Sequence, residues 1–571
     1  MLAGKLRGAL IAALMMSGSS TYAQDISFDA GAYLAARAAG KTADFDEGAA
    51  FYQRALLADR TNPAILENAL TAELSRGAFG RAVELANTIV DQGINSQIPN
   101  IVILAESAAV GHWERVFEEL ARDHTVGPVV DGLAQGWAHL ALGDLDKALA
   151  SFDAVSETPG LQSFGIYHKA LALASVGDFE GAVRIFDLTT ASDGLRHNRR
   201  SAMAHAQILV QVGRRDDALT LIDTVFGSNL DSRLVDLRQR IADGGDVPYD
   251  IITTPAEGIA EIFLAVAEAL QSDAPDNYIL IYARAAQYLT PDDTETLLLT
   301  ARILESLERY GLANKTYAAV SRNDPAYPIA ELGRAEALRD GGQFEAATEV
   351  LHALTRDYPH MPAVYVALGD TMREIGDTAA ANAAYTEALN RYQPSNPDRW
   401  IVHYTRAVTF HQLDQWPEAE ADFRAALDFR PDQPQILNYL GYSLVERGEK
   451  LDEALTMIER AVAAQPQNGA IVDSLGWVLF QLGQYEDAVV HLENAAALEA
   501  VDPVINDHLG DAYWAVGRFI EAEFQWNRAL SFLEADDHKT AERIRRKLSV
   551  GLDAVLIAEG EDPITVADGT P

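Results

Sequence analysis

The chain has 571 residues, of which 48% are hydrophobic and 23% are charged, and its formal net charge is −39. This hydrophobic content is enough for a large core and excludes wholesale disorder. A chain with so much negative charge repels phosphate backbones, which excludes nucleic acid as its partner. The chain contains no cysteine, so disulfides, thiolate metal sites and a thiol nucleophile are excluded as well.

Residues 1–23 have the pattern of a secretory signal peptide. Lys5 and Arg7 form a short positive region, the apolar run ALIAALMM follows, and the segment ends in SGSSTYA, whose small residues suit a signal peptidase. No later apolar run reaches the roughly 18 residues that span a bilayer. We therefore expect a periplasmic protein without a transmembrane segment. Because the chain has no cysteine, we also expect no lipid anchor.

Residues 24–241 are expected to form an irregular helical array. Alanines recur there at spacings of about 34 residues. The segments ALGDLDKALASFDAV and SVGDFEGAVRIFD share a Gly-Asp turn that is followed by an alanine. The stretch ADGGDVPYDIITTPAEG then breaks the period. Because it is rich in Gly, Pro and Asp, we predict that residues 242–258 are a junction loop before a second, regular array.

Residues 259–535 contain the clearest internal repeat. The segments LGDTMREIGDTAAANAAYTEA, LGYSLVERGEKLDEALTMIERA, LGWVLFQLGQYEDAVVHLENA and LGDAYWAVGRFIEAEFQWNRA all begin with Leu-Gly, carry a second glycine further on and then an alanine. The first glycine and the alanine are expected to face each other where two antiparallel helices cross closely. The second glycine is expected to end the first helix in a left-handed conformation. The pattern predicts helix–turn–helix units.

The last residues are predicted to close the array. A single capping helix is expected over residues 536–557, with its apolar residues at helical spacing and its basic residues, Arg543, Arg545, Arg546 and Lys547, on the solvated remainder. A docking patch is the alternative interpretation of this basic run. Residues 558–571 have the composition of a disordered tail.

The repeat resembles the tetratricopeptide repeat (TPR), which has a period of 34 residues, small residues at positions 8, 20 and 27 and proline near position 32. The resemblance implies an all-α fold, a right-handed α-α superhelix of about fourteen helix–turn–helix units. It also implies that the first helix of each unit lines a concave groove. The groove residues that it implies as partner-binding are Tyr404, His411, Asn438, Tyr442, Asp473, Trp477, Phe480, Asp507, Asp511 and Trp514.

This predicted groove is aromatic and edged with carboxylates, which favours a protein partner of basic or neutral character. Trp477 and Trp514 have two interpretations: anchors for a partner, or side chains that pack between neighbouring first helices. No catalytic motif, cofactor motif or metal-ligand spacing is present, and the 13 scattered histidines fit structural roles. We therefore expect a non-catalytic protein without a cofactor or a metal.

The segment from Asn438 to Ala495 is similar to the carboxy-terminal units of bacterial outer-membrane TPR lipoproteins. Those proteins are adaptors for carboxy-terminal processing proteases and present murein hydrolases for degradation. The resemblance implies an envelope scaffold or adaptor whose partner is such a protease or its substrate, peripheral to the outer membrane. The family is anchored through a cysteine, which this chain lacks. The alternative is an envelope-assembly or export component that acts on polysaccharide or on an outer-membrane machine.

Overall fold

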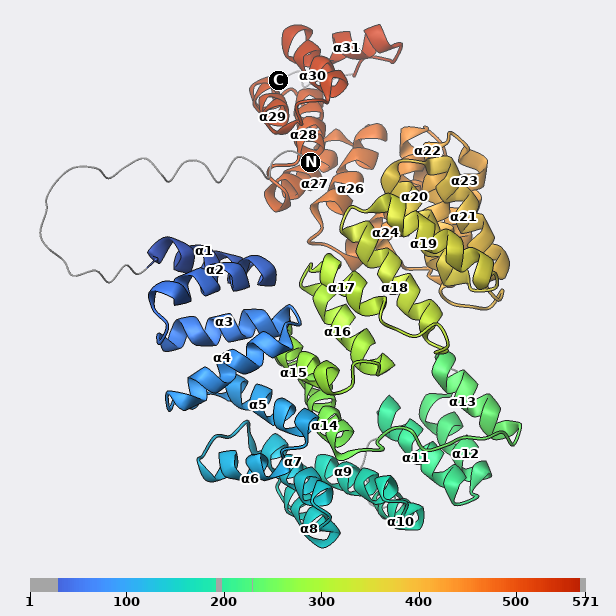
Figure 1. The fold of residues 1–571 in the computed structure, drawn as a ribbon. Helices are drawn as coiled ribbons and strands as arrows, with labels where there is room; N and C mark the ends of the chain where they lie inside the picture. The colour runs from blue at the N-terminus through green and yellow to red at the C-terminus, as the bar shows by residue number, and fades with distance from the viewer. Residues whose placement is uncertain (1–28, 191–197, 228–229, 565–571) are drawn as a thin grey trace, which may run out of the picture. The chain divides into compact units, whose positions relative to one another are not determined.

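The computed structural model describes residues 29–190, 198–227 and 230–564, so the predicted signal peptide lies outside the described residues. The described residues form thirty-one α-helices and no β-strand (Figure 1). The chain divides into two compact units, residues 1–343 and 344–571. In both units consecutive helices pack against each other as antiparallel hairpins, and this confirms the predicted all-α fold.

The first unit contains α1 (Ala30–Lys41), α2 (Phe45–Ala58), α3 (Pro63–Ser75), α4 (Phe79–Asp91), α5 (Gln97–Val110), α6 (Trp113–Ala121), α7 (Pro128–Ala141), α8 (Leu145–Ser156), α9 (Gln162–Ser175), α10 (Phe179–Thr190), α11 (Arg199–Gln211), α12 (Arg215–Phe226), α13 (Ser232–Ala242), α14 (Pro255–Leu270), α15 (Asp276–Leu289), α16 (Thr294–Ser306), α17 (Tyr310–Tyr317) and α18 (Tyr327–Asp340). Many of these helices begin at a polar side chain that binds the first turn. Asp44, Asn62 and Asp144, for example, each accept a hydrogen bond from the backbone N–H three residues on.

The second unit contains α19 (Phe344–Asp357), α20 (Pro362–Ile375), α21 (Thr378–Arg391), α22 (Arg399–Gln412), α23 (Trp416–Phe429), α24 (Pro434–Glu446), α25 (Leu451–Ala464), α26 (Gly469–Gln481), α27 (Tyr485–Leu498), α28 (Pro503–Ala515), α29 (Phe519–Phe532), α30 (His538–Val550) and α31 (Leu552–Glu559). From α20 to α29 the even-numbered helices are the first helices of the repeat units and the odd-numbered ones are the second. Neighbouring first helices α24, α26 and α28 also contact each other in sequence.

The two glycines of each repeat have separate structural roles. The second one ends the first helix with a positive φ, as predicted; φ is 74° at Gly483. The first one lies against a large side chain of the second helix. A Cβ at Gly476 would stand 2.5 Å from Cγ of Leu492, four residues after the repeat's alanine, Ala488. The glycine therefore makes room for this bulky residue, whereas the sequence pattern suggested that it faces the alanine.

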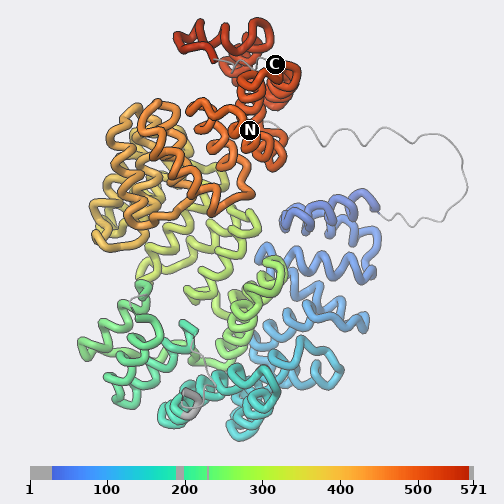
Figure 2. The backbone as a smooth tube through the Cα atoms, turned by 180° about the vertical axis from the view of Figure 1, so that it is seen from behind, coloured from blue at the N-terminus to red at the C-terminus, as the bar shows by residue number. Residues whose placement is uncertain are grey.

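Helices α14 and α15 fold back onto the earlier helices of the first unit. α14 packs against α5, α7 and α9, and α15 packs against α3 and α5 (Figures 1 and 2). The predicted junction at 242–258 holds the coil after α13 and the start of α14, but it does not separate two arrays. The division between the compact units falls at residue 343 instead. The reason is that α14 and α15 bury their apolar residues in the first unit's core.

The end of the second unit differs from the predicted single capping helix over 536–557. Two helices, α30 and α31, are separated at Gly551, whose φ is 83°. Gly551 lies against the ring of Trp514, where a Cβ would stand 2.6 Å from the ring, so the chain turns at the one residue type that fits. The predicted tail is ordered as far as Ile564, whose N–H donates to Asp553 at 2.9 Å; residues 565–571 lie outside the described residues.

Candidate functional site

The sequence-predicted groove residues of α22, α24 and α26 lie on one surface, which we call the first-helix face: Tyr404, His411, Asn438, Tyr442, Trp477 and Phe480. All six side chains are half-buried. Aromatic contacts join the first two of these helices through Tyr439, whose ring packs edge-on against Tyr404 at 6.2 Å. Its hydroxyl lies 3.2 Å from Nδ1 of His411. The α22 and α24 parts of the face thus form a partly exposed aromatic cluster.

Trp477 is held in place by contacts within the protein. Its ring stacks on Phe480 of the same helix at 4.9 Å and on His508 of α28 at 4.0 Å. Its Nε1–H donates to Oε1 of Glu446 at 3.0 Å. Of the two interpretations of Trp477, these contacts favour packing between neighbouring first helices, because both the ring and the indole N–H already have partners.

Glu446, at the end of α24, is not among the residues that the sequence predicts for the groove. Its carboxylate is exposed, yet it is oriented by the Trp477 N–H. Burial raises the pKa of the Tyr442 hydroxyl, and the nearby negative charges of Glu446 and Asp473 raise it further. Tyr442 therefore stays a neutral hydrogen-bond donor beside the Glu446 side chain. No sequence signal marks Glu446, since it is not among the residues that the repeat pattern places in the groove.

Asp473, predicted to face the groove, is buried and lies 3.0 Å from Nδ1 of His508. Burial lowers the pKa of His508, but the negative charge of Asp473 and its hydrogen bond outweigh that effect, and the pKa is raised overall. The charged imidazolium is therefore stabilised between a carboxylate and the Trp477 ring. This pair fixes α28 against α26 and leaves Asp473 unavailable to an outside partner.

The predicted groove residues of α28 do not lie on an open surface, because α30 and α31 cover them. Nζ of Lys547 in α30 binds Asp507 at 2.8 Å and Asp511 at 2.7 Å, and its side chain is fully buried. Trp514 packs against Gly551 and donates its Nε1–H to Asp553 of α31 at 2.9 Å. Lys547 was expected on the solvated side of the capping helix, and the structure corrects this: it is the residue that holds α30 in place.

The pKa of Asp511 is raised overall, because burial and the nearby negative charge of Asp507 both raise it. The Lys547 ammonium acts in the opposite direction and lowers it in part. The indole N–H of Trp526 also donates to Asp511 at 2.8 Å. Two buried carboxylates thus share one ammonium and one indole donor. These buried carboxylates stabilise the packing of α30 on α28 only while the Lys547 ammonium remains between them.

A second buried ion cluster lies in the first unit and joins α14 to α11 and α16. Arg200 of α11 donates to Glu261 of α14 at 2.6 Å and to Asp293, the residue before α16, at 3.1 Å. Glu261 also accepts from the Tyr167 hydroxyl at 2.8 Å. Each of these charges has an opposite charge or a donor within the cluster, which indicates a role in holding the helices together rather than in catalysis.

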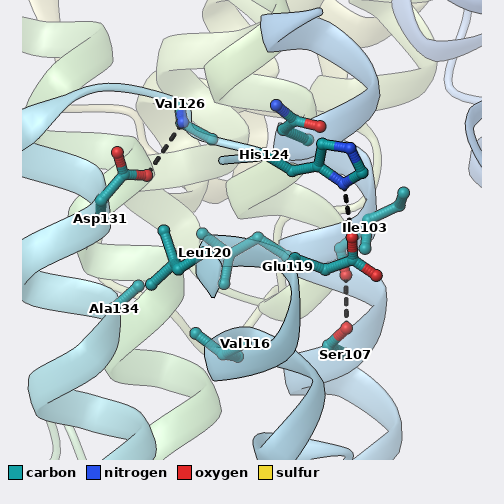
Figure 3. A pocket seen from close by; sticks show the side chains of 11 residues that line it. Ile103, Ser107, Val116, Glu119, Leu120, His124, Val126, Asp131 and Ala134 are labelled. Atoms are coloured by element: carbon teal, nitrogen blue, oxygen red, sulfur yellow. Dashed lines mark hydrogen bonds and ion pairs between the residues drawn. The ribbon is translucent and has the colours of Figure 1, made fainter. Parts of the chain in front are cut away.

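A small cavity lies between α5, α6 and α7 (Figure 3). Its volume is about 30 Å³, the space of one or two water molecules, so it has no room for an organic substrate. Glu119 lies in it, 2.7 Å from Nδ1 of His124. Burial raises the pKa of Glu119, but the hydrogen bonds from His124 and Arg115 outweigh it and lower the pKa overall. The cavity therefore offers a satisfied polar pair and no reactive group.

Within the described ranges, His, Asp and Glu side chains form no group of three or more that could hold a metal ion. Over the same part of the chain, each helix is too short or too polar to cross a membrane.

Three segments, residues 298–362, 366–434 and 440–503, match a family model for the tetratricopeptide repeat, and residues 132–154 match a second model of that description. The chain is 26% identical to the TPR repeat-containing protein PA4667 of Pseudomonas aeruginosa over 37% of this chain and 35% of that protein. It is 22% identical to the BBSome complex member BBS4 of Bos taurus over 59% of this chain and 65% of that protein. The chain thus spans less than two thirds of either relative.

Among solved structures, the chain resembles one in the crystal structure of the APC/C hetero-tetramer Cut9–Hcn1. The TM-score is 0.37 and the identity 12%, over 91% of this chain and 96% of that one. The matched segments carry tetratricopeptide repeats, and the helical hairpins of the described residues define the fold class, an all-α superhelical TPR fold. Proteins of this class generally act as scaffolds in protein–protein interaction.

Proposed function

We propose that this protein is a non-catalytic scaffold that binds a protein partner through the first-helix face of α22, α24 and α26. One observation carries the proposal. Inside the second unit, the described helices that pack against these three are their neighbours in the array. The corresponding surface of α28, by contrast, is covered by the chain's own α30 and α31. The first-helix face is therefore a stretch of repeat surface that the later helices of the second unit do not cover, unlike that of α28.

The finer proposal is an envelope adaptor. The pattern of residues 1–23 supports export to the periplasm, and the likeness of the segment from Asn438 to Ala495 to outer-membrane adaptors supports the presentation of substrates to an envelope protease. A long repeat surface suits such a role, because each unit adds a strip of contact to a single partner.

The test is crosslinked capture from the cell envelope with matched baits. The face variant carries Ile401→Arg and Ala470→Arg, two exposed positions on α22 and α26. The control carries Ile520→Arg and Phe524→Arg on the outer side of α29, where the side chains are 82% and 61% exposed. Exposed substitutions change stability by about 0.5 kcal/mol or less, so all baits should stay folded.

We expect the wild-type and control baits to capture the same proteins, and the face variant to lose them. If the face variant retains them, the partner binds elsewhere and the proposal is wrong. If wild type and control recover glycan in place of protein, the polysaccharide alternative replaces it.

A further inference from the structure

We propose that the first-helix face receives a lysine or arginine side chain of its partner at Glu446, between Tyr442 and Trp477; we call this place the Glu446 corner. This inference rests on the proposed function and adds the chemistry of the partner to it. The occupant is an extended protein segment that carries a basic residue.

The charge balance around the corner is the first argument. Two carboxylates on second helices of the second unit are paired with cations: Glu453 binds Arg424 at 2.8 Å and Glu493 binds Arg518 at 2.9 Å. Glu446 is exposed, and among the described residues no cation forms an ion pair with it. An oriented carboxylate without a counter-charge complements a basic side chain.

The chemistry beside the carboxylate is the second argument. The Trp477 N–H donates to Oε1 of Glu446 at 3.0 Å, which restrains the carboxylate before any partner arrives. The Tyr442 hydroxyl, whose pKa is raised by burial and by Glu446, remains protonated and adds no negative charge of its own. Preorganised acceptors of this kind bind a cation at a lower entropic cost than a free carboxylate on a flexible side chain.

The chain's own α30 gives the third argument, because it shows what a first-helix surface of this array holds. On α28, Asp507 and Asp511 bind the ammonium of Lys547, which also lies 5.9 Å from the centre of the Trp526 ring. Two repeat units after α24, carboxylates and a tryptophan ring thus already bind a lysine side chain of the chain itself. The net charge of −39 would also speed the approach of a basic segment.

The experiment uses the full-length protein and three synthetic peptides that differ only in charge. Each alternates alanine with lysine, glutamine or glutamate and carries a central benzophenone, and crosslinks are located by mass spectrometry. A salt concentration of about 0.15 M screens long-range attraction to the acidic surface. The test variant is Glu446→Gln, whose amide oxygen can still accept the Trp477 N–H. The matched control is Glu523→Gln, an exposed glutamate on α29.

We expect the lysine peptide to label α22, α24 and α26 above all other segments. Labelling should fall about tenfold in Glu446→Gln, as loss of one hydrogen bond to a charged group implies, and should not change in Glu523→Gln. If the glutamine or glutamate peptide labels the face as strongly as the lysine peptide, the inference is wrong while the proposed function stands.

Lysine-peptide labelling spread over the whole surface, and insensitive to Glu446→Gln, would also overturn the inference. In that case the capture experiment with the Ile401 and Ala470 variant decides the proposed function separately.

Discussion

Replacement of Lys547 by methionine should release the two C-terminal helices from the array. The substitution keeps most of the length of the side chain but leaves Asp507 and Asp511 buried without their cation. Removal of one partner from a buried ion pair costs about 3–5 kcal/mol, because the remaining charge is desolvated and unpaired. Since 1.4 kcal/mol is a factor of ten, opening of α30 should become at least about a hundredfold more frequent.

Hydrogen exchange measured segment by segment is the suitable assay, because repeat arrays need not unfold in one step and a local opening is what changes. Exchange at α30 and α31 should accelerate, whereas exchange at α22 should not. Arg546→Met is the control, since Arg546 is the exposed neighbour on the same helix. The triple variant Lys547→Met, Asp507→Asn, Asp511→Asn should recover most of the protection, because it buries no charge.

The pH dependence of the Lys547→Met defect tests whether the unpaired charge of Asp511 causes it. Burial raises the pKa of Asp511 in the folded state, so protonation of this carboxyl favours the folded state as the pH falls through the raised pKa. Loss of Lys547 should raise that pKa further, and the defect of Lys547→Met should therefore be smaller near about pH 5 than near about pH 7. If Lys547→Met protects α30 as well as Arg546→Met at both pH values, the reasoning from the buried ion set is refuted.

Three further predictions concern α26 and α28. Gly476→Leu should lower the melting temperature by overpacking against Leu492, at a cost of about 1–3 kcal/mol or more; an unchanged melt would contradict the close helix crossing. Trp477→Ala should cost about 3 kcal/mol or more, measured by denaturant unfolding, because the ring is stacked on both Phe480 and His508; a negligible loss would restore its interpretation as an exposed anchor. The pKa of His508 is raised in the folded state, so its pairing with Asp473 stabilises fully below about pH 6.5 and is lost as the pH rises through the raised pKa. Thermal melts of wild type and His508→Gln should converge in alkaline solution, and a gap that widened there would reverse the assignment.

The repeat units could be predicted because their signals are local. The glycine that ends the first helix, as at Gly483, acts on its own backbone, and the apolar spacing of each helix lies within a few turns. These features fix the hairpin and its register wherever the unit lies in the chain. The role of the first glycine was only half predicted, since the sequence marks a close approach but not which side chain of the second helix lies opposite.

The candidate site was harder to predict, because the sequence indicates which positions face the concave side but not what else lies there. The prediction placed Tyr442 and Asp507 in equivalent surroundings. In the structure Tyr442 is on a partly exposed face, whereas Asp507 is paired with Lys547 under α30. Nothing local to α28 distinguishes the two cases.

The sequence by itself therefore determined the helices and turns of the regular repeat units, since each depends on residues close together in the chain. Only the tertiary structure decided which repeat surfaces are covered by the chain's own helices. That outcome depends on distant pairs, such as the guanidinium of Arg284 donating to the carbonyl of Ser75 across 209 residues and Lys547 binding Asp507 across 40. Such pairs form only where packing brings the helices together, and no periodic pattern records them.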